Sequence, residues 1–576
     1  MTVTSDYFPT DAAGLTPACA PMIVDVADGE ELTLTIAPVA KKLGDDIVRM
    51  LAYNGSVPGP ALRVRQGTEI VVHAVNCGDL DATVHWHGLR LDNQYDGTTE
   101  TQAPIPIGGR FSYRLSFPDP GIYWYHPHIR HDYGQEMGLA GTIIVCPNTR
   151  GYWPAVDREI SLVLDDVLLE DGRIAPFSRS TTTFAAMGRF GNVLLANGEP
   201  NLQLGARQGE IVRCYLVNTA NTRVFNVGIP GTRMKRVGGD SGRYEREQIV
   251  DGVILSPSER AIVDVFLEEA GALTLEHRTP DRTYTLATFH VAPAPHLTSA
   301  ASGFDNLRTN PEMVAERERL ASFLSAPPDK TVALIGQMDM GEPELPVGAT
   351  LAYSCPMHPE VISGETGRCP KCGMKLLATA APPVGYACPM HPEVTSDSPD
   401  RCPHCGMKLL PAQLVAAAAA DHSQGDQHGH DHHHPGDHSH DAGGIEWEDD
   451  MPEVNRITTP ANMRWKLVDR DTGAEGHAID WRFRVGDQVK IRIVNEMDSD
   501  HPMHHPFHIH GAGRFLILAR DGIVEPNLVW KDTVLVPTGQ TVDILLDVTN
   551  AGIWMAHCHI AEHHESGMML NFTVDP

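Results

Sequence analysis

The sequence predicts an all-β protein that contains three copies of one β-sandwich. Short runs of alternating apolar and polar residues lie between glycine- and proline-containing turns, as in 63–76 and 489–497. This alternation is typical of strands with one buried face. Three related segments, 65–76, 207–218 and 484–495, indicate an internal repeat. The length of 576 residues is too great for a single core and also favours several domains.

Each copy continues with two further matching stretches. VHWHG at 84, FNVG at 225 and FHIHG at 507 follow the opening segments. The copies then end on GIYWYHPH (121–128), GALTLEHR (271–278) and GIWMAHCH (552–559). We therefore expect sandwich domains at 20–150, at 155–295, and at 329–352 joined to 446–576. The third copy is interrupted by an insert.

Charge and hydropathy exclude some classes of partner. The formal net charge is −29, which argues against nucleic acid and favours solubility over the steering of cationic partners. No run of 18 apolar residues occurs, so we expect no membrane span. The first residues lack the basic and apolar regions of a signal peptide. The location therefore stays open: cytoplasmic, or periplasmic or extracellular if the chain is written in its mature form.

Histidine pairs mark equivalent strands of copies one and three. These pairs are His85 with His87, His126 with His128, His508 with His510, and His557 with His559. Copy two instead carries Asn226, Gly228, Glu276 and Arg278. Because residues i and i+2 of a strand point to one face, each pair directs two imidazoles to the same place. Eight imidazoles suit three metal ions with open positions, and imidazole favours copper, zinc, iron or nickel.

A second donor set occurs in copy three alone. Cys558 stands between two of these histidines, so its side chain points away from theirs. His505, His563 and Met568 complete a set of two histidines, one cysteine and a weak methionine, which defines a blue copper site. The backbone of Cys558 would connect this site directly to two histidines of the cluster.

These motifs resemble those of a known family. HWHG at 85, WYHPH at 124, HPFHIHG at 505 and HCHIAEHHESGM at 557 are similar to the four copper motifs of the three-domain bacterial multicopper oxidases. That family includes laccases and cuprous oxidases, and the resemblance covers everything outside 353–445. It implies three cupredoxin-like Greek-key sandwiches and four copper ions, one blue and three in a trinuclear cluster. It also implies a copper-dependent oxidoreductase that reduces dioxygen to water.

The resemblance implies a role for each matching residue. His85 and His508 would hold the single cluster copper. The coupled pair would be held by His87, His126, His128, His510, His557 and His559. Asp96 matches the family's acid near the oxygen site and would support proton delivery. Relatives often carry a proton-donating glutamate directly after the second blue-copper histidine, where this chain has His564 and then Glu565. We therefore regard Asp96, Cys558 and His564 as candidate catalytic residues.

The insert carries a third kind of site. Residues 353–410 hold two tandem modules with a period of 33, each reading C-x2-H and then C-x2-C. The predicted ligands are Cys355, His358, Cys369 and Cys372, then Cys388, His391, Cys402 and Cys405. This spacing suits tetrahedral zinc, and soft thiolates would also suit Cu(I). The modules resemble small heavy-metal-binding domains of metal-efflux proteins. Two roles for the modules remain open: a structural zinc ion that holds each small module folded, and the capture of metal ions.

An Ala- and His-rich linker at 411–445 follows the modules. Eight histidines lie in 421–441, which favours weak copper or zinc collection over a plain solvated linker. The leading substrate is therefore Cu(I) or another low-valent metal, in copper tolerance. The alternatives are a laccase that oxidises phenols and aromatic amines, or a copper-sequestering protein.

Overall fold

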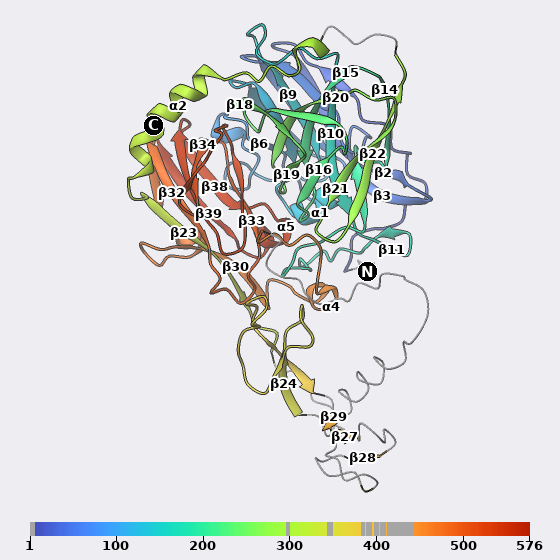
Figure 1. Cartoon of the computed structure of the whole chain (residues 1–576), viewed down its shortest axis with the longest axis vertical. Helices are drawn as coiled ribbons and strands as arrows, with labels where there is room; N and C mark the ends of the chain where they lie inside the picture. The colour runs from blue at the N-terminus through green and yellow to red at the C-terminus, as the bar shows by residue number, and fades with distance from the viewer. Residues whose placement is uncertain are drawn as a thin grey trace. The chain divides into compact units, whose positions relative to one another are not determined.

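The computed structural model describes residues 6–294, 300–341, 350–381 and 443–576, with short pieces at 386–387, 394–396, 403 and 410–411. Two compact units are present, one of Met1–Gln337 with Ala442–Pro576 and one of Met338–Asp441. Figure 1 shows that strands dominate the chain, so the all-β prediction is confirmed. None of the described helices is long and apolar enough to cross a membrane.

The first pair of sheets comes from the N-terminal residues, blue to cyan in Figure 1. The sheet orders are β3-β2-β5-β7 and β1-β4-β9-β8-β6. The strands are β1 (Ile23–Asp25), β2 (Glu31–Leu43), β3 (Asp46–Tyr53), β4 (Ala61–Arg65), β5 (Glu69–Asn76), β6 (His85–His87), β7 (Arg110–Ser116), β8 (Gly121–His126) and β9 (Gly141–Cys146). The short helices are η1 (Asn93–Tyr95) and α1 (His131–Glu136).

The second pair of sheets has the orders β13-β10-β15-β20-β17-β18 and β14-β22-β21-β16-β19, with the separate hairpin β11-β12. The strands are β10 (Arg158–Val167), β11 (Leu169–Glu170), β12 (Arg173–Ile174), β13 (Val193–Ala196), β14 (Leu202–Arg207), β15 (Glu210–Asn218), β16 (Phe225–Gly228), β17 (Arg233–Gly238), β18 (Arg243–Val250), β19 (Val253–Leu255), β20 (Arg260–Leu267), β21 (Gly271–Arg278) and β22 (Thr283–Ala292).

The third pair of sheets has the orders β30-β23-β32-β37-β34-β35 and β31-β39-β38-β33-β36. The strands are β23 (Lys330–Met338), β30 (Met463–Asp469), β31 (Trp481–Arg484), β32 (Gln488–Asn495), β33 (His505–Ile509), β34 (Gly513–Arg520), β35 (Ile523–Val524), β36 (Thr533–Val536), β37 (Thr541–Val548), β38 (Gly552–Cys558) and β39 (Met569–Asp575). The helices after β22 are η2 (Ala301–Gly303), α2 (Pro311–Leu324), α4 (Pro452–Arg456), η4 (Gly476–Ala478) and α5 (Ala561–Glu565).

Helix α2 connects the second and third sandwiches and does not belong to the repeat. The Asn310 side chain caps its start by accepting from the Glu312 amide, and Pro311 occupies the first turn. Its buried residues Met313 and Leu320 pack in a cluster with Leu516 and other apolar side chains of the third sandwich. The helix therefore fastens this connection to the core.

The repeat places equivalent strands in equivalent pairings. β5, β15 and β32 each pair parallel with an earlier strand, β2, β10 and β23 respectively. The motif strands pair antiparallel as β6 with β8, β16 with β21 and β33 with β38. In this register His85 faces His126, and His508 faces His557. Both histidine-bearing pairings thus bring two motifs of one copy side by side.

The second compact unit contains two three-stranded sheets, β25-β24-β26 and β28-β27-β29. Their strands are β24 (Thr350–Ser354), β25 (Ile362–Ser363), β26 (Leu377–Ala381), β27 (Tyr386–Ala387), β28 (Thr395–Ser396) and β29 (Leu410–Pro411). This unit begins at Met338, before the boundary at 353 that the sequence suggested. Ile445, placed in the linker by sequence, is buried in the main unit against Val224 and Leu535.

Candidate metal centre

Eight buried imidazoles enclose one space between the first and third sandwiches. Their ring nitrogens fall into overlapping groups of possible metal donors. These groups are His85, His508 and His510, then His85, His87 and His126, then His128, His510 and His557. The His559 ring lies 5.0 Å from that of His87 and 5.1 Å from that of His126, between centroids. The structure therefore brings together all eight histidines predicted from the motifs.

In four of the eight rings, a protein oxygen holds one nitrogen and leaves the other to face this space. The Nδ1 atoms of His85, His126, His508 and His557 lie 2.7–2.9 Å from main-chain carbonyl oxygens. The Nε2 atoms of His85, His126, His128 and His508 are buried without a hydrogen-bond partner among the described residues. His87 is reversed: its Nε2 contacts Asp532 and its Nδ1 is unpaired. Such outer contacts set the tautomer of a metal-binding histidine.

The burial of these rings keeps them in the form that binds metal. Burial is the largest cause that lowers the pKa of His87, His126, His128, His508, His510, His557 and His559 below the ordinary value. Neutral imidazole is the ligand form. The convergent, unpaired nitrogens therefore fit a cluster of metal ions for which imidazole is the natural ligand.

Asp96 contacts two of the eight rings. Its Oδ2 lies 2.8 Å from His510 Nδ1, and its main-chain oxygen lies 2.7 Å from His85 Nδ1. Burial alone would raise the pKa of Asp96, but the facing His510 and His85 rings hold it well below the ordinary value. Asp96 is thus a buried carboxylate that orients His510 through its side chain and His85 through its backbone.

The predicted blue copper residues also meet. His505 Nδ1 and His563 Nδ1 lie 3.5 and 3.8 Å from Cys558 Sγ, and 3.3 Å from each other. Met568 is fully buried, and its backbone bonds to both Cys558 and His563. Burial raises the pKa of the Cys558 thiol, so the thiolate requires a bound cation. Two imidazoles and one thiol, with the buried Met568 bonded to Cys558 and His563 through its backbone, fit copper.

Strand β38 joins the two sites. His557 and His559 enter the eight-ring space, while Cys558 between them turns to the opposite face. The His563 ring is fixed by a contact of 3.1 Å between its Nε2 and the Ala186 oxygen. Trp465 stacks on it with centroids 4.1 Å apart. A single residue step therefore separates a donor of one site from donors of the other.

His564 lies beside the cluster, and a second histidine that the sequence analysis did not single out, His131, lies next to it. The His131 and His564 rings lie 4.5 Å apart between centroids, and both are buried. Glu565 Oε1 lies 3.2 Å from His131 Nδ1 and 3.9 Å from His564 Nδ1. The sequence identified His564 by its position but missed His131. The signal was a third histidine shortly after His126 and His128.

Two further groups were missed. Asp532 of the third sandwich contacts His87 of the first at 2.9 Å, between Oδ1 and Nε2. Met187 Sδ of the second sandwich lies 3.1 Å from His501 Nε2, and both side chains are buried. The HPMH segment before His505 carries extra histidines and could have signalled His501. Nothing in the sequence pairs Met187 with it.

The first inserted module forms a compact donor set. Cys355 Sγ lies 3.7 Å from His358 Nδ1 and 3.6 Å from Cys372 Sγ, and Cys369 Sγ lies 3.6 Å from His358 Nδ1. Hydrogen bonding from Cys372 is the main cause that lowers the pKa of Cys355 to about 5. Three thiols and one imidazole suit tetrahedral zinc. The second set, Cys388, His391, Cys402 and Cys405, and the histidines of 421–441 lie outside the described residues.

The fold and donor sets define an all-β metalloprotein, and comparisons with known proteins specify its class. Multicopper oxidase family models match residues 38–150 and 447–576, and a heavy metal binding domain model matches 352–379 and 386–412. Multicopper oxidase MmcO of Mycobacterium tuberculosis is 30% identical over 46% of this chain and 57% of its own length. Multicopper oxidase mco of Staphylococcus epidermidis is 22% identical over 90% of this chain and 82% of its own.

Solved structures show the same cupredoxin-like fold. A multicopper oxidase from Campylobacter jejuni, described as a metallo-oxidase, matches with a TM-score of 0.60 and 18% identity, covering both chains completely. One from Pseudomonas thermotolerans matches with a TM-score of 0.60 and 21% identity over 96% of this chain and all of its own. This chain belongs to the multicopper oxidases, a family of copper-dependent oxidoreductases, and carries inserted heavy-metal-binding domains.

Proposed function

We propose that the chain oxidises a reducing substrate one electron at a time at the Cys558 site and reduces dioxygen to water at the eight-histidine site. The observation that supports this proposal most is the His557–Cys558–His559 segment at the end of β38, in which candidate donors of both sites are successive residues. Four coppers, when bound, would supply the one-electron redox chemistry by which four electrons and four protons convert one dioxygen to two waters.

The chain's own residues would supply geometry and exclude solvent. Main-chain carbonyl oxygens select one tautomer for four of the eight cluster rings, while Asp96 holds His510 and Asp532 holds His87. Cys558 would be the electron-transferring ligand, with His505, His563 and Met568 around it. Asp96, with His564 beside the cluster, is proposed to support proton delivery.

Cu(I) is the substrate that soft donors near the Cys558 site favour. The loop 185–187 provides the carbonyl oxygen that contacts His563, and Met187 follows directly in this loop. Met187 Sδ and His501 Nε2 are 3.1 Å apart, and His501 lies 6.0 Å from Trp465 between ring centroids. Trp465 in turn contacts the rings of both His505 and His563. A thioether with an imidazole suits Cu(I) far better than it suits a phenol.

Rates of dioxygen uptake with Cu(I) and with a phenol on one preparation test this proposal. We expect Met187→Leu to lower kcat/KM for Cu(I) by about tenfold, equivalent to about 1.4 kcal/mol, while the rate with a phenol is unchanged. Met234→Leu is the control, because Met234 is equally buried but belongs to the core of the second sandwich. Equal losses for both substrates would contradict a Cu(I) site at Met187.

A laccase acting on phenols or aromatic amines is the second candidate. Two rice relatives similar over 91% of this chain are named as putative laccases, at 22% and 24% identity. A wild-type preference for the phenol would favour that function. If Cys558→Ser retained copper tolerance in cells, a copper-sequestering protein would be favoured instead.

A further inference from the structure

The second sandwich carries no histidine pair, yet one of its residues reaches the cluster. Arg260 opens strand β20 and is fully buried. Its Nε donates to the Ile122 oxygen of the first sandwich at 3.0 Å. Its Nη1 and Nη2 donate to Asp532 Oδ1 and Oδ2 of the third sandwich at 2.6 and 2.5 Å. One guanidinium thus bonds to residues of both copper-binding sandwiches.

Asp532 connects this arginine to two cluster rings. Its Oδ1 lies 2.9 Å from His87 Nε2, and its main-chain oxygen lies 2.9 Å from His508 Nδ1. Thr533 Oγ1 supports the same two rings at 3.0 and 3.1 Å. His87 and His508 come from different sandwiches and stack with centroids 3.7 Å apart. The Asp532 segment therefore fixes the place where the two halves of the cluster meet.

The packing leaves little freedom around this contact. A Cβ atom on Gly88 would lie 2.4 Å from Asp532 Oδ2 and 2.7 Å from Arg260 Nη2. Gly88 also has a φ of +84°, which favours glycine. The residue after His87 must therefore be glycine for the Arg260–Asp532 ion pair to fit beside it. Since a bidentate arginine sets both position and plane of a carboxylate, Arg260 defines where Asp532 points.

We propose that Arg260 makes the second sandwich a positioning element for the copper cluster, by fixing Asp532 and through it His87 and His508. This inference rests on the proposed four-copper function but concerns residues that supply no ligand. Loss of an outer contact to a metal-binding histidine typically weakens metal binding by about 10- to 100-fold. Arg260 acts one step further out, so we expect the lower end of that range.

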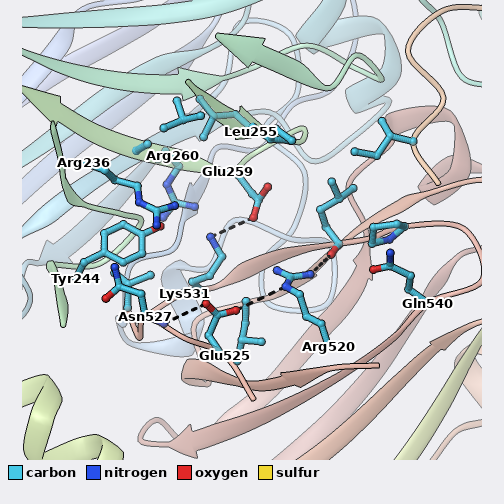
Figure 2. Close-up of a pocket in the computed structure, with 18 residues that line it drawn as sticks. Arg236, Tyr244, Leu255, Glu259, Arg260, Arg520, Glu525, Asn527, Lys531 and Gln540 are labelled. Atoms are coloured by element: carbon cyan, nitrogen blue, oxygen red, sulfur yellow. Dashed lines mark hydrogen bonds and ion pairs between the residues drawn. The ribbon is translucent and has the colours of Figure 1, made fainter. Parts of the chain in front are cut away.

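Arg260 also lines a cavity, together with Glu259 and Lys531. Lys531 Nζ lies 3.2 Å from Asp240 Oδ2 and 3.1 Å from Glu259 Oε1. Figure 2 shows Lys531, Glu259 and Arg260 around this cavity of about 380 Å³, which lies between the second and third sandwiches. Small solutes can therefore approach the position of the Arg260 side chain, which permits chemical rescue of a shortened residue.

The test compares Arg260→Met with Arg213→Met in the full chain. Arg213 makes the same kind of buried bidentate pair in the same sheet, with Asp264 at 2.7 and 2.9 Å. The side chain of Arg213 contacts Asp264, Glu159, the Pro154 oxygen and the Trp153 ring, none of which is a cluster residue. Each variant therefore removes the arginine partner of one buried carboxylate. Copper content is measured after dialysis against a graded copper chelator, together with the visible band of the Cys558 site.

We expect Arg260→Met to weaken cluster copper binding by about tenfold and to keep the blue band, whereas Arg213→Met binds copper as the wild type does. Equal copper binding in both variants, or an equal loss, would overturn the proposal. If Arg260→Met does not fold, Arg260→Lys is used instead, because lysine keeps the charge but cannot bond to both carboxylate oxygens as the guanidinium does. Its loss of copper affinity should be smaller and confined to the cluster. Methylguanidinium should restore copper to Arg260→Ala but not to Asp532→Ala, and failure of that rescue would count against Arg260.

Discussion

Replacing Asp96 by asparagine tests whether an outer carboxylate controls the cluster. The substitution keeps the shape of the side chain and removes the charge that His510 Nδ1 faces at 2.8 Å. A charge-assisted hydrogen bond becomes a neutral one, and the imidazole becomes a weaker ligand. We expect copper affinity at the cluster to fall by about 10- to 100-fold, which corresponds to about 1.4–2.7 kcal/mol.

Chelator competition measures this loss, and dioxygen uptake measures its effect on turnover. Asp469→Asn is the matched control, because the buried Asp469 carboxylate accepts from Trp481 Nε1 at 2.6 Å and from the Asp471 and Thr472 amides, none of which is a candidate donor. The control should retain all copper and full activity. Unchanged copper affinity in Asp96→Asn, or an equal loss in Asp469→Asn, would refute the reasoning that the carboxylate acts through His510.

Four further outcomes are expected. Cys558→Ser should abolish the blue band, since a hydroxyl is a poor soft ligand, while the eight-histidine cluster retains its copper; a surviving band would disprove the assignment. Met568→Leu should keep copper and colour and raise the reduction potential, so loss of copper itself would point to another role. Asp469→Asn should lower the free energy of unfolding most above about pH 4. Because hydrogen bonds hold the pKa of Asp469 below its ordinary value despite burial, the difference from wild type should shrink as the pH falls, and a constant difference would contradict this. Deletion of 339–441, which retains buried Ile445, should leave four coppers and the phenol rate intact but reduce Cu(I) oxidation at low Cu(I); equal losses for both substrates would indicate a structural role for the modules.

Local periodicity was sufficient to predict much of the candidate site. His85 and His87, like His557 and His559, are two residues apart, and a strand places such residues on one face whatever surrounds it. The same rule puts Cys558 on the opposite face. Comparison of the repeats then showed which copies kept donors, and the all-β fold followed from the same alternation.

Tertiary contacts decided what periodicity leaves open. His87 and Asp532 are 445 residues apart, and their contact selects Nε2 rather than Nδ1 as the held nitrogen of that ring. Met187 of the second sandwich likewise contacts His501 of the third, although the two residues are 314 positions apart in the sequence. No spacing rule connects such residues, because their separation depends on how the sandwiches pack.

The sequence by itself determined the fold class and the repeat and predicted the candidate donors, since these depend on strand geometry and ligand chemistry within a few neighbouring residues. Only the tertiary structure decided which nitrogen is free in rings such as those of His85 and His87, which carboxylates contact the rings, and that Arg260 of the second sandwich reaches Asp532. Those features depend on side chains from distant strands meeting in a buried space, where most polar atoms are paired with a neighbour.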